Sequence, residues 1–275
     1  MMVAGTGAVA AQQTRPKALS GRPTRYKLVW ADEFNYNGVP DAQKWSYDSG
    51  HGNDGWGNQE WQDYKAGDTS TTYVSNGLLR IQANRTITGT DTVFTSARLK
   101  TKQKASWKYG KIEVRAKTAY GLGVCSAIWM MPADDQKNGG WPFCGEIDIM
   151  EHIGWESHKD SIFQTVHTGA YNHLKKTQKG MRTYIPRSWQ TFHSYVLEWT
   201  PEGIDYFIDG LHRYHFPNEH KTMEEWPFDT AFYLIMNISV GGQWEGAFGI
   251  DPAIFPAAMF VDYVRVYQMP DHYSN

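Results

Sequence analysis

Short runs of alternating apolar and polar residues follow one another from about Tyr26 to the C-terminal region, separated by glycine, asparagine, aspartate and proline. Such alternation places every second side chain on the same face of a strand. Two of the breaks, Asn76-Gly77 and Asp209-Gly210, have the composition of tight hairpin turns. Helical periodicity is absent apart from a short turn expected at Asp41–Trp45. The predicted strands are Lys27–Trp30, Thr72–Ser75, Leu78–Ala83, Ser96–Lys102, Gly110–Ala116, Ser126–Met131, Glu146–Glu151, Ile162–His167, Phe192–Trp199, Ile204–Ile208, Leu211–Phe216, Phe232–Val240 and Met259–Tyr267.

Strands joined by turns, without helices between them, predict an all-β fold, namely an antiparallel β-sandwich or jelly roll. The chain has 275 residues and shows no internal repeat or linker, so we expect a single domain over residues 26–270. Residues 1–25 are expected to be a disordered arm or a signal-peptide remnant. Ala8-Val9-Ala10 fits a small-residue cleavage site, although no basic segment precedes it.

The longest stretch without a predicted strand is Asn35–Asp68. Long loops in compact domains are usually functional or disordered. This one contains Trp45, Trp56 and Trp61, which argues against disorder. We therefore expect a loop that packs over one end of the sandwich.

The only two cysteines, Cys125 and Cys144, lie on or near two neighbouring predicted strands. If these strands form a hairpin, the two residues are about six strand positions apart, or roughly 20 Å at about 3.3 Å per residue. A disulfide requires Cα atoms within about 7 Å. We therefore predict two free thiols.

The segment from Gly145 to His152 concentrates acidic residues on one predicted strand. Strict alternation places Glu146 and Asp148 on the same face, whereas Glu151 falls on the other. One extra residue, a β-bulge near Ile149-Met150, would return Glu151 to the acidic face and bend the strand.

Neighbouring carboxylates repel, so a purely structural role does not explain this arrangement. A pair of carboxyls with different pKa values is what a retaining glycosidase uses, one as an ionised nucleophile and the other as a proton donor. Asp148 can hydrogen-bond one glutamate and hold its protonation state. The alternative without a catalytic role is a half-exposed amphipathic strand.

Other side chains on nearby predicted strands could bind a substrate. Trp129 and Trp141 could stack on the apolar faces of sugars, or belong to the core. His167 follows on the next strand, where a lone histidine is more often structural. Arg98 could donate a fork of hydrogen bonds to hydroxyls, or form a surface salt bridge.

Composition and net charge limit the kinds of partner that the protein is expected to bind. The net charge of −2 does not favour a nucleic acid or an anionic membrane. No run of 18 apolar residues is present, so no membrane span is expected. The 12 Trp, 16 Tyr and 12 Phe suit strands and sugar-stacking surfaces alike.

The sequence Glu-Ile-Asp-Ile-Met-Glu-His, residues 146–152, resembles the ExDxxE signature of family 16 glycoside hydrolases. Met150 supplies the extra residue of this segment. With it, the segment is similar to that of the laminarinase branch (endo-β-1,3-glucanases) rather than to that of the lichenase branch. One departure is Cys125-Ser126, where relatives usually have proline before Ala-Ile-Trp. The other similar segments, in the expected order, are Trp30–Phe34, Gly57–Glu60, Ala127–Pro132, Phe192–Pro201 and Val261–Tyr267.

The resemblance implies a concanavalin-like jelly roll whose concave face forms a cleft for β-glucan. It implies that Glu146 is the nucleophile, Asp148 its electrostatic helper and Glu151 the general acid/base. The glucose subsites would be lined by Asn58, Arg98, Trp129, Trp141 and His167, with Gly241-Gly242-Gln243-Trp244 as a further loop at the cleft.

No cofactor for catalysis is expected, but the resemblance implies a structural Ca²⁺ far from the acids. The matching positions are Glu33, Gly77 and Asp262, and oxygen ligands suit this ion. We also expect a monomer that is secreted or periplasmic.

Other functions stay open at this point. A non-catalytic glucan-binding module would keep the aromatics but would not need both glutamates. A metalloenzyme could use the acids with His152 and His167, although His152 should face away from Glu151. Agarase or carrageenase activity, mixed β-1,3/1,4-glucan cleavage and transglycosylation are further alternatives.

Overall fold

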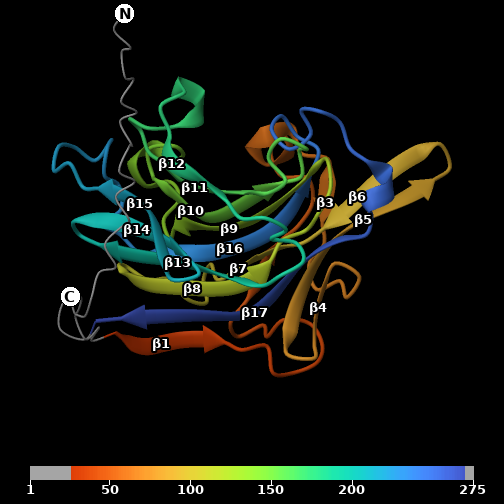
Figure 1. The fold of residues 1–275 in the computed structure, drawn as a ribbon, viewed down its shortest axis with the longest axis horizontal. Coiled ribbons are helices and arrows are strands. Elements are labelled where there is room, and N and C mark those ends of the chain that lie inside the picture. The colour runs from red at the N-terminus through yellow and green to blue at the C-terminus, as the bar shows by residue number, and fades with distance from the viewer. Residues whose placement is uncertain (1–25, 270–275) are drawn as a thin grey trace, which may run out of the picture.

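The computed structural model describes residues 26–269, which form two stacked β-sheets (Figure 1). The larger sheet has ten strands in the order β15-β14-β13-β8-β17-β5-β6-β3, with β1 added beside β17 and β4 beside β5. The smaller sheet has seven strands in the order β12-β11-β10-β9-β16-β7-β2. Apart from the parallel pair β3–β6, the paired strands are antiparallel, which confirms the predicted sandwich. The arm or signal remnant predicted for residues 1–25 lies outside the described residues.

The larger sheet consists of β1 (Lys27–Asp32), β3 (Gln62–Tyr64), β4 (Thr72–Ser75), β5 (Leu78–Thr88), β6 (Asp91–Ser96), β8 (Gly110–Lys117), β13 (His193–Thr200), β14 (Gly203–Ile208), β15 (Leu211–Pro217) and β17 (Ala257–Gln268). The smaller sheet consists of β2 (Ser46–Asp48), β7 (Arg98–Lys100), β9 (Val124–Pro132), β10 (Glu146–Ile153), β11 (Ser161–His167), β12 (Lys179–Tyr184) and β16 (Phe232–Val240). Helical turns occur at η1 (Gly55–Gln59), η2 (Lys137–Gly139), η3 (His173–Lys175) and η4 (Pro252–Ile254). Among the described residues, no helix is long and apolar enough to cross a membrane.

Several strand predictions were incomplete. The predicted loop Asn35–Asp68 contains β2 and β3, which are too short, at three residues each, to show an alternating pattern. Strand β12 was missed because five of its six residues are exposed, so it has no apolar face. The turn at Asp41–Trp45 is confirmed, since the backbone N–H groups of Lys44 and Trp45 both donate to the Asp41 carbonyl.

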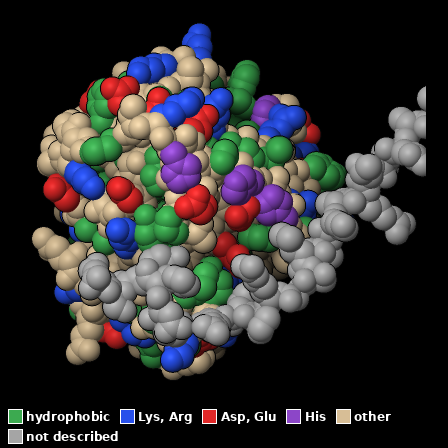
Figure 2. Space-filling model, turned by 90° about the vertical axis from the view of Figure 1, so that its left-hand side faces the viewer, with side chains coloured by type: hydrophobic (Ala, Val, Ile, Leu, Met, Phe, Trp, Pro, Cys, Tyr) green, Lys and Arg blue, Asp and Glu red, His purple; other side chains and the backbone are tan. Residues whose placement is uncertain are grey.

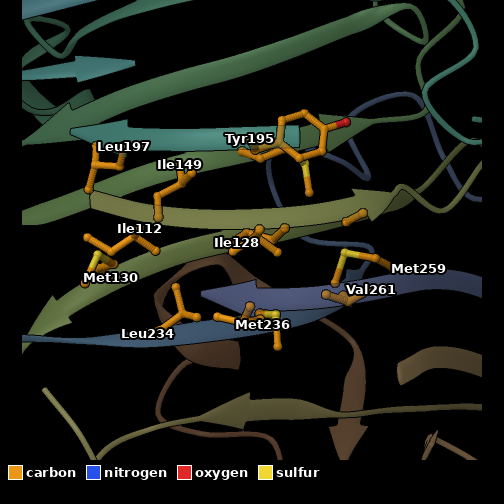
Figure 3. Packing of buried hydrophobic residues seen from close by; sticks show 14 of the residues in the cluster. Ile112, Ile128, Met130, Ile149, Tyr195, Leu197, Leu234, Met236, Met259 and Val261 are labelled. Atoms are coloured by element: carbon orange, nitrogen blue, oxygen red, sulfur yellow. The ribbon is translucent and has the colours of Figure 1, made fainter. Parts of the chain in front are cut away.

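The core lies between the two sheets. Figure 3 shows side chains of the larger sheet, such as Ile112 and Val261, packed close to Ile128, Met130 and Ile149 of the smaller sheet. All of these side chains are fully buried. Burying each one stabilises the fold by about 1.5–3 kcal/mol relative to leaving it exposed.

Strand β16 lies in the middle of the smaller sheet and is buried along its whole length. Its inner face belongs to the core, and its outer face carries Asn237 and Ser239. Other segments of the protein therefore cover this outer face. The site described below includes side chains of this face. The two cysteines are free and buried, as predicted.

Histidine and acidic side chains gather on the side of the molecule that Figure 2 shows, where β14 and β15 lie in Figure 1. Polar, charged groups on an edge strand discourage pairing with another sheet. Histidine–carboxylate contacts on these strands and the loops beside them include His193–Asp209 at 2.7 Å, His212–Asp205 at 2.8 Å, His215–Asp205 at 2.9 Å and His220–Glu202 at 3.0 Å.

Candidate active site

A bulge bends β10 where the sequence predicts it. On β9, Trp129 pairs with Asp148 and Ile128 pairs with Met150, so Ile149 has no partner of its own there. The unpaired residue is thus Ile149, not Met150 as the sequence suggested. The Ile149 carbonyl accepts a hydrogen bond from Gln164 Nε2 at 3.1 Å, which satisfies it inside the protein.

The bulge brings all three acids of β10 to one face. Their partners on β11 are His167 for Glu146, Thr165 for Asp148 and Phe163 for Glu151. These partners are alternate residues, so they and the three acids share one face of the smaller sheet. We call this the acidic face. The residues between the acids, including Ile149 and Met150, point into the core.

Burial makes proton release from Glu151 unfavourable. It raises the pKa of Glu151 to about 8, with further contributions from the charges of Glu146 and Glu245. A carboxyl that keeps its proton near neutral pH can serve as a general acid.

Asp148 and Glu146 share a hydrogen bond with opposite effects on the two groups. The pKa of Asp148 is raised well above its ordinary value by burial, by the charges of Glu146 and Glu151, and by this bond. Burial also raises the pKa of Glu146, whereas His173, the Trp141 indole N–H and Asp148 oppose that rise. Asp148 therefore holds its proton and helps Glu146 to stay ionised.

His167 lies beside these two acids. Its Nε2 is 3.5 Å from Asp148 Oδ2 and 3.9 Å from Glu146 Oε1. Burial lowers the pKa of His167 to about 4, so the ring is neutral at physiological pH. The ring also lies 6.0 Å from Trp141 and 5.3 Å from His173, centroid to centroid.

Glu146, Asp148 and His167 are also the described residues that could jointly hold a metal ion, because their ligand atoms lie within 4.8 Å of one another. His152 is not part of this group. Its Nε2 is 2.7 Å from the Lys159 carbonyl and its ring packs against Trp189. The expectation that His152 faces away from Glu151 is thus confirmed.

Arg98 lies between two indoles. Its guanidinium carbon is 4.7 Å from the ring centroids of both Trp56 and Trp129, and its Nε is 3.1 Å from Asp48 Oδ2. Trp129 Nε1 donates to Asn237 Oδ1 at 2.7 Å. The Trp129 ring is thereby fixed, and it lies opposite Asp148 in the ladder.

Asn58, predicted as a substrate contact, is held by other parts of the protein. Its Nδ2 donates to Glu245 Oε2 at 2.9 Å, and its Oδ1 accepts from the Gln243 backbone at 3.3 Å. Asn58 therefore joins η1 to the Gly241–Trp244 loop. Its role toward a sugar stays a prediction.

Aromatic rings border the acidic face beside Glu151. The Trp244 ring is 5.4 Å from that of Phe163, the ladder partner of Glu151. Close by in the chain, Trp155 meets Phe248 at 4.8 Å. The sequence indicated Trp244 but missed the other three. Those three rings do not share one predicted strand, so no common alternation pattern groups them.

Glu60, Glu245 and His173 are the titratable residues at this face that sequence reasoning missed. Glu60 lies in the segment that resembles family 16, so it carried a signal, but no role was assigned to it. Glu245 lies in the loop after β16 and His173 begins the short turn η3, where no periodicity indicates which side chains turn inward.

The predicted calcium positions lie on the larger sheet and its turns. Glu33 accepts two hydrogen bonds from Arg265, at 2.7 and 2.8 Å, and Asp262 pairs with Arg115. A methyl group placed on Gly77 would lie 3.8 Å from Asn35 Oδ1, so this turn lies against the segment that follows Glu33.

Three acids on one face of a bulged strand, one of which keeps its proton near neutral pH, match the site of the two-carboxylate glycosidase class. The model of the family "Glycosyl hydrolases family 16" matches residues 58–264, and the chain belongs to this family.

Individual relatives are similar along nearly the whole chain. A protein of Rhodothermus marinus named beta-glucanase is 49% identical over 258 residues, which covers 90% of this chain and 87% of that protein. The X-ray structure of the laminarinase from Rhodothermus marinus matches with a TM-score of 0.83 at 49% identity, covering 88% of this chain and 97% of that one. A non-specific endo-β-1,3(4)-glucanase of family GH16 matches with a TM-score of 0.83 at 46% identity, covering 90% and 92%.

Proposed function

We propose that this chain is an endo-acting, retaining glycoside hydrolase that cleaves β-1,3-glucan and also accepts mixed β-1,3/1,4-glucan. The observation that carries the proposal is the placement of Glu146 and Glu151 on one face, with Asp148 between them. The names of the relatives, beta-glucanase and endo-β-1,3(4)-glucanase, support the same substrate class.

In the first step, Glu146 attacks the anomeric carbon of the sugar. The glycosidic C–O bond breaks while Glu151 gives its proton to the departing oxygen, which leaves a glycosyl ester on Glu146. In the second step, Glu151 takes a proton from water as the water oxygen attacks the same carbon. Glu146 is released as a carboxylate, and the product keeps its original β configuration.

Asp148 and His167 hold the nucleophile ready. Asp148 keeps its proton and hydrogen-bonds Glu146 with it, and neutral His167 lies against both acids without adding a charge. Trp141 and the Arg98–Trp129 stack provide flat and hydrogen-bonding surfaces on the Glu146 side. The rings of Phe163 and Trp244 provide a surface on the Glu151 side, where the leaving group departs.

The substrate class is tested by incubating the protein with laminarin, barley β-glucan, agarose and κ-carrageenan and sizing the products. We expect short oligosaccharides from the first two within early time points, because an endo enzyme cuts inside the chain. Products from agarose or carrageenan alone would refute the proposed substrate, and binding without products would indicate a glucan-binding module instead.

The role of Glu146 is tested by Glu146→Ser. The variant should lose hydrolysis by on the order of 10³-fold or more, because no covalent intermediate can form. Laminarin affinity, measured by calorimetry, should stay within a few-fold of the unchanged protein. Persistent turnover would exclude Glu146 as the nucleophile.

A calcium ion on the larger sheet is also part of the proposal. The pairing of Asp32 with Val264 brings the neighbouring Glu33 and Asp262 toward one another, and the Gly77 turn lies next to that segment. Backbone carbonyls and one carboxylate at these positions offer the oxygen ligands that the ion prefers. The ion would tie the first and last strands together, without a part in catalysis.

A further inference from the structure

A second pair of acids, Glu245 and Glu60, lies across β9 from Glu151 and has no part in the mechanism above. Glu245 follows the Gly241–Trp244 loop after β16 and is 1% exposed. Glu60 follows η1 and pairs through its backbone with Gly241. A buried carboxyl is costly unless it is hydrogen-bonded, so the contacts of this pair need an explanation.

Glu245 is held as an acceptor at both oxygens. Ser239 Oγ donates to Oε1, and Asn58 Nδ2 donates to Oε2 at 2.9 Å. Its backbone is fixed as well, because Trp155 Nε1 donates to the Glu245 carbonyl at 3.1 Å. Burial raises the pKa of Glu245, whereas these two donors lower it and favour the ionised carboxylate.

Glu60 is tied to the same network. Its Oε2 accepts from Gln62 Nε2 at 2.6 Å and from the Tyr64 hydroxyl at 3.4 Å. The Tyr64 hydroxyl accepts in turn from Asn237 Nδ2 at 3.0 Å, and Asn237 holds Trp129. Glu60 is thus linked to the indole that lies opposite Asp148.

Only small side chains of β9 separate Ser239, which holds Glu245, from the end of β10 that carries Glu151. Ser239 pairs with Cys125 on β9, and Glu151 pairs with Ala127 two residues along. Burial and the charges of Glu151, Glu245 and Glu60 raise the pKa of the Cys125 thiol, so all three acids act on this one position. The thiol therefore stays neutral and does not screen Glu245 from Glu151.

We propose that Glu245 is a positioning residue for the acid step, in which its buried carboxylate keeps the proton on Glu151 until the glycosidic oxygen takes it. Burial and the charge of Glu245 raise the pKa of Glu60 to about 7. The inference rests on the proposed hydrolase function, because Glu151 acts as the general acid only there. The charge on Glu245 is one of two carboxylate charges that raise the pKa of Glu151, the other being Glu146.

The other groups around Glu151 do not duplicate the proposed effect of the Glu245 charge. Glu146 and Asp148 share its strand, and Asp148 is held protonated. On the β11 side the neighbours are neutral, namely Phe163 and Thr165, with His167 uncharged. The other charged or titratable groups in the surroundings are His158 stacked on Phe163, Arg182 bonded to His158, Tyr206 on the opposite sheet, and Arg98 beyond Trp129.

The second step makes Glu245 more important. Once Glu146 carries the sugar as an ester, its negative charge is gone, and Glu151 must act as a base. Glu245 is then the remaining carboxylate that acts on Glu151 and keeps it basic.

The test compares pH profiles of kcat/KM on laminarin for the unchanged protein, Glu245→Gln and a matched control, Glu198→Gln. Glu198 is a half-buried acid on β13 that interacts with Lys111 and Asp205, away from Glu151. In Glu245→Gln, the alkaline limb should move down by about one pH unit. In Glu198→Gln it should not move. An unmoved limb in Glu245→Gln, or an equal shift in both variants, overturns the proposal.

Two further variants separate charge from packing. Glu245→Asp keeps the charge, so its limb should stay within about 0.3 pH unit of the unchanged protein. Glu60 is not among the charges that act on Glu151, so Glu60→Gln should leave the limb in place. If Glu245→Asp shifts the limb as far as Glu245→Gln does, the residue acts through packing and the proposal fails.

A measurement that needs no turnover keeps the two hypotheses apart. In protein labelled with ¹³C-glutamate, the carboxyl signal of Glu151 is assigned by its loss in Glu151→Gln. Its titration should move down in Glu245→Gln by about the same unit. An unmoved titration refutes the role of Glu245, whereas a shifted titration in a protein that cleaves no glucan refutes the proposed function alone.

Discussion

Three carboxyls of one strand have different surroundings, and single side chains create the difference. Asp148 is enclosed, with acids on both sides, and holds its proton. Glu146 accepts a hydrogen bond from protonated Asp148 and faces His173 and the Trp141 N–H. Glu151 has no such donors and is raised to a pKa of about 8. Nucleophile and acid are therefore distinguished by neighbours rather than by residue type.

These surroundings predict the pH dependence of the reaction. Glu151 must be protonated for the first step, so kcat/KM should fall as the pH rises through about 8. In Glu151→Gln, kcat/KM should drop by on the order of 10²–10⁴-fold, and the alkaline limb should disappear. A Glu151→Gln profile that keeps the same alkaline limb would assign that limb to another group.

Arg98 offers a second test at this scale. Arg98→Lys loses the planar stack between Trp56 and Trp129, so we expect KM for laminarin to rise about tenfold, with the pH limbs unchanged. Arg115→Lys is the matched control, because Arg115 also combines an acid partner, Asp262, with an aromatic ring, Phe192. It should leave KM unaltered. Equal effects of both changes on KM would argue against a substrate role for Arg98.

Among the elements, β10 depends on its bulge. The ladder skips Ile149 and thereby returns Glu151 to the face of Glu146 and Asp148. A strand without the extra residue would keep simple alternation, with the order acid, apolar, acid, apolar, acid. The bulge therefore fits the five steps from Glu146 to Glu151 onto the four steps from His167 to Phe163 without moving the acids off their face.

This reasoning predicts opposite results for two deletions in β10. Deleting Ile149 should leave the three acids on one face, so activity should stay within about tenfold, although the lost buried side chain costs about 3 kcal/mol of stability. Deleting Ile147 removes a similar side chain but turns Glu146 to the core face, and should abolish activity. Laminarin assays and urea unfolding of both variants check this. Similar activity in the two would mean that register does not place the acids.

The same strand shows what the sequence could and could not predict. The alternation of Glu146, Ile147 and Asp148 revealed the face, and the wrong parity of Glu151 revealed the bulge. In contrast, Glu245 lies in a loop and His173 in the short turn η3, and tertiary contacts such as the bond from Asn58 to Glu245 set the direction of such segments. Strands β2 and β12 were missed for a related reason, since neighbouring strands define them more than their own pattern does.

For the whole molecule, the proposed calcium site separates stability from catalysis. A chelator should lower the melting temperature by about 5 °C, because the ion would tie β1 to β17. The value of kcat below that temperature should not change, since the acids lie on the other sheet. Asp262→Asn should make the melting temperature insensitive to the chelator. A fall in kcat without a fall in melting temperature would point instead to metal bound by Glu146, Asp148 and His167.

The pairing of the first strand with the last has a consequence for chain connectivity. Lys27 lies opposite Gln268 in the β1–β17 ladder, so a short Gly/Ser linker can join them. The exposed tip of the β5–β6 hairpin, at Gly89, can then carry the new termini. We expect this circular permutant to fold and to cleave laminarin at a rate within about threefold of the original order. The acidic face would then depend on spatial neighbours alone, and the order in which its strands are synthesised would be free to change.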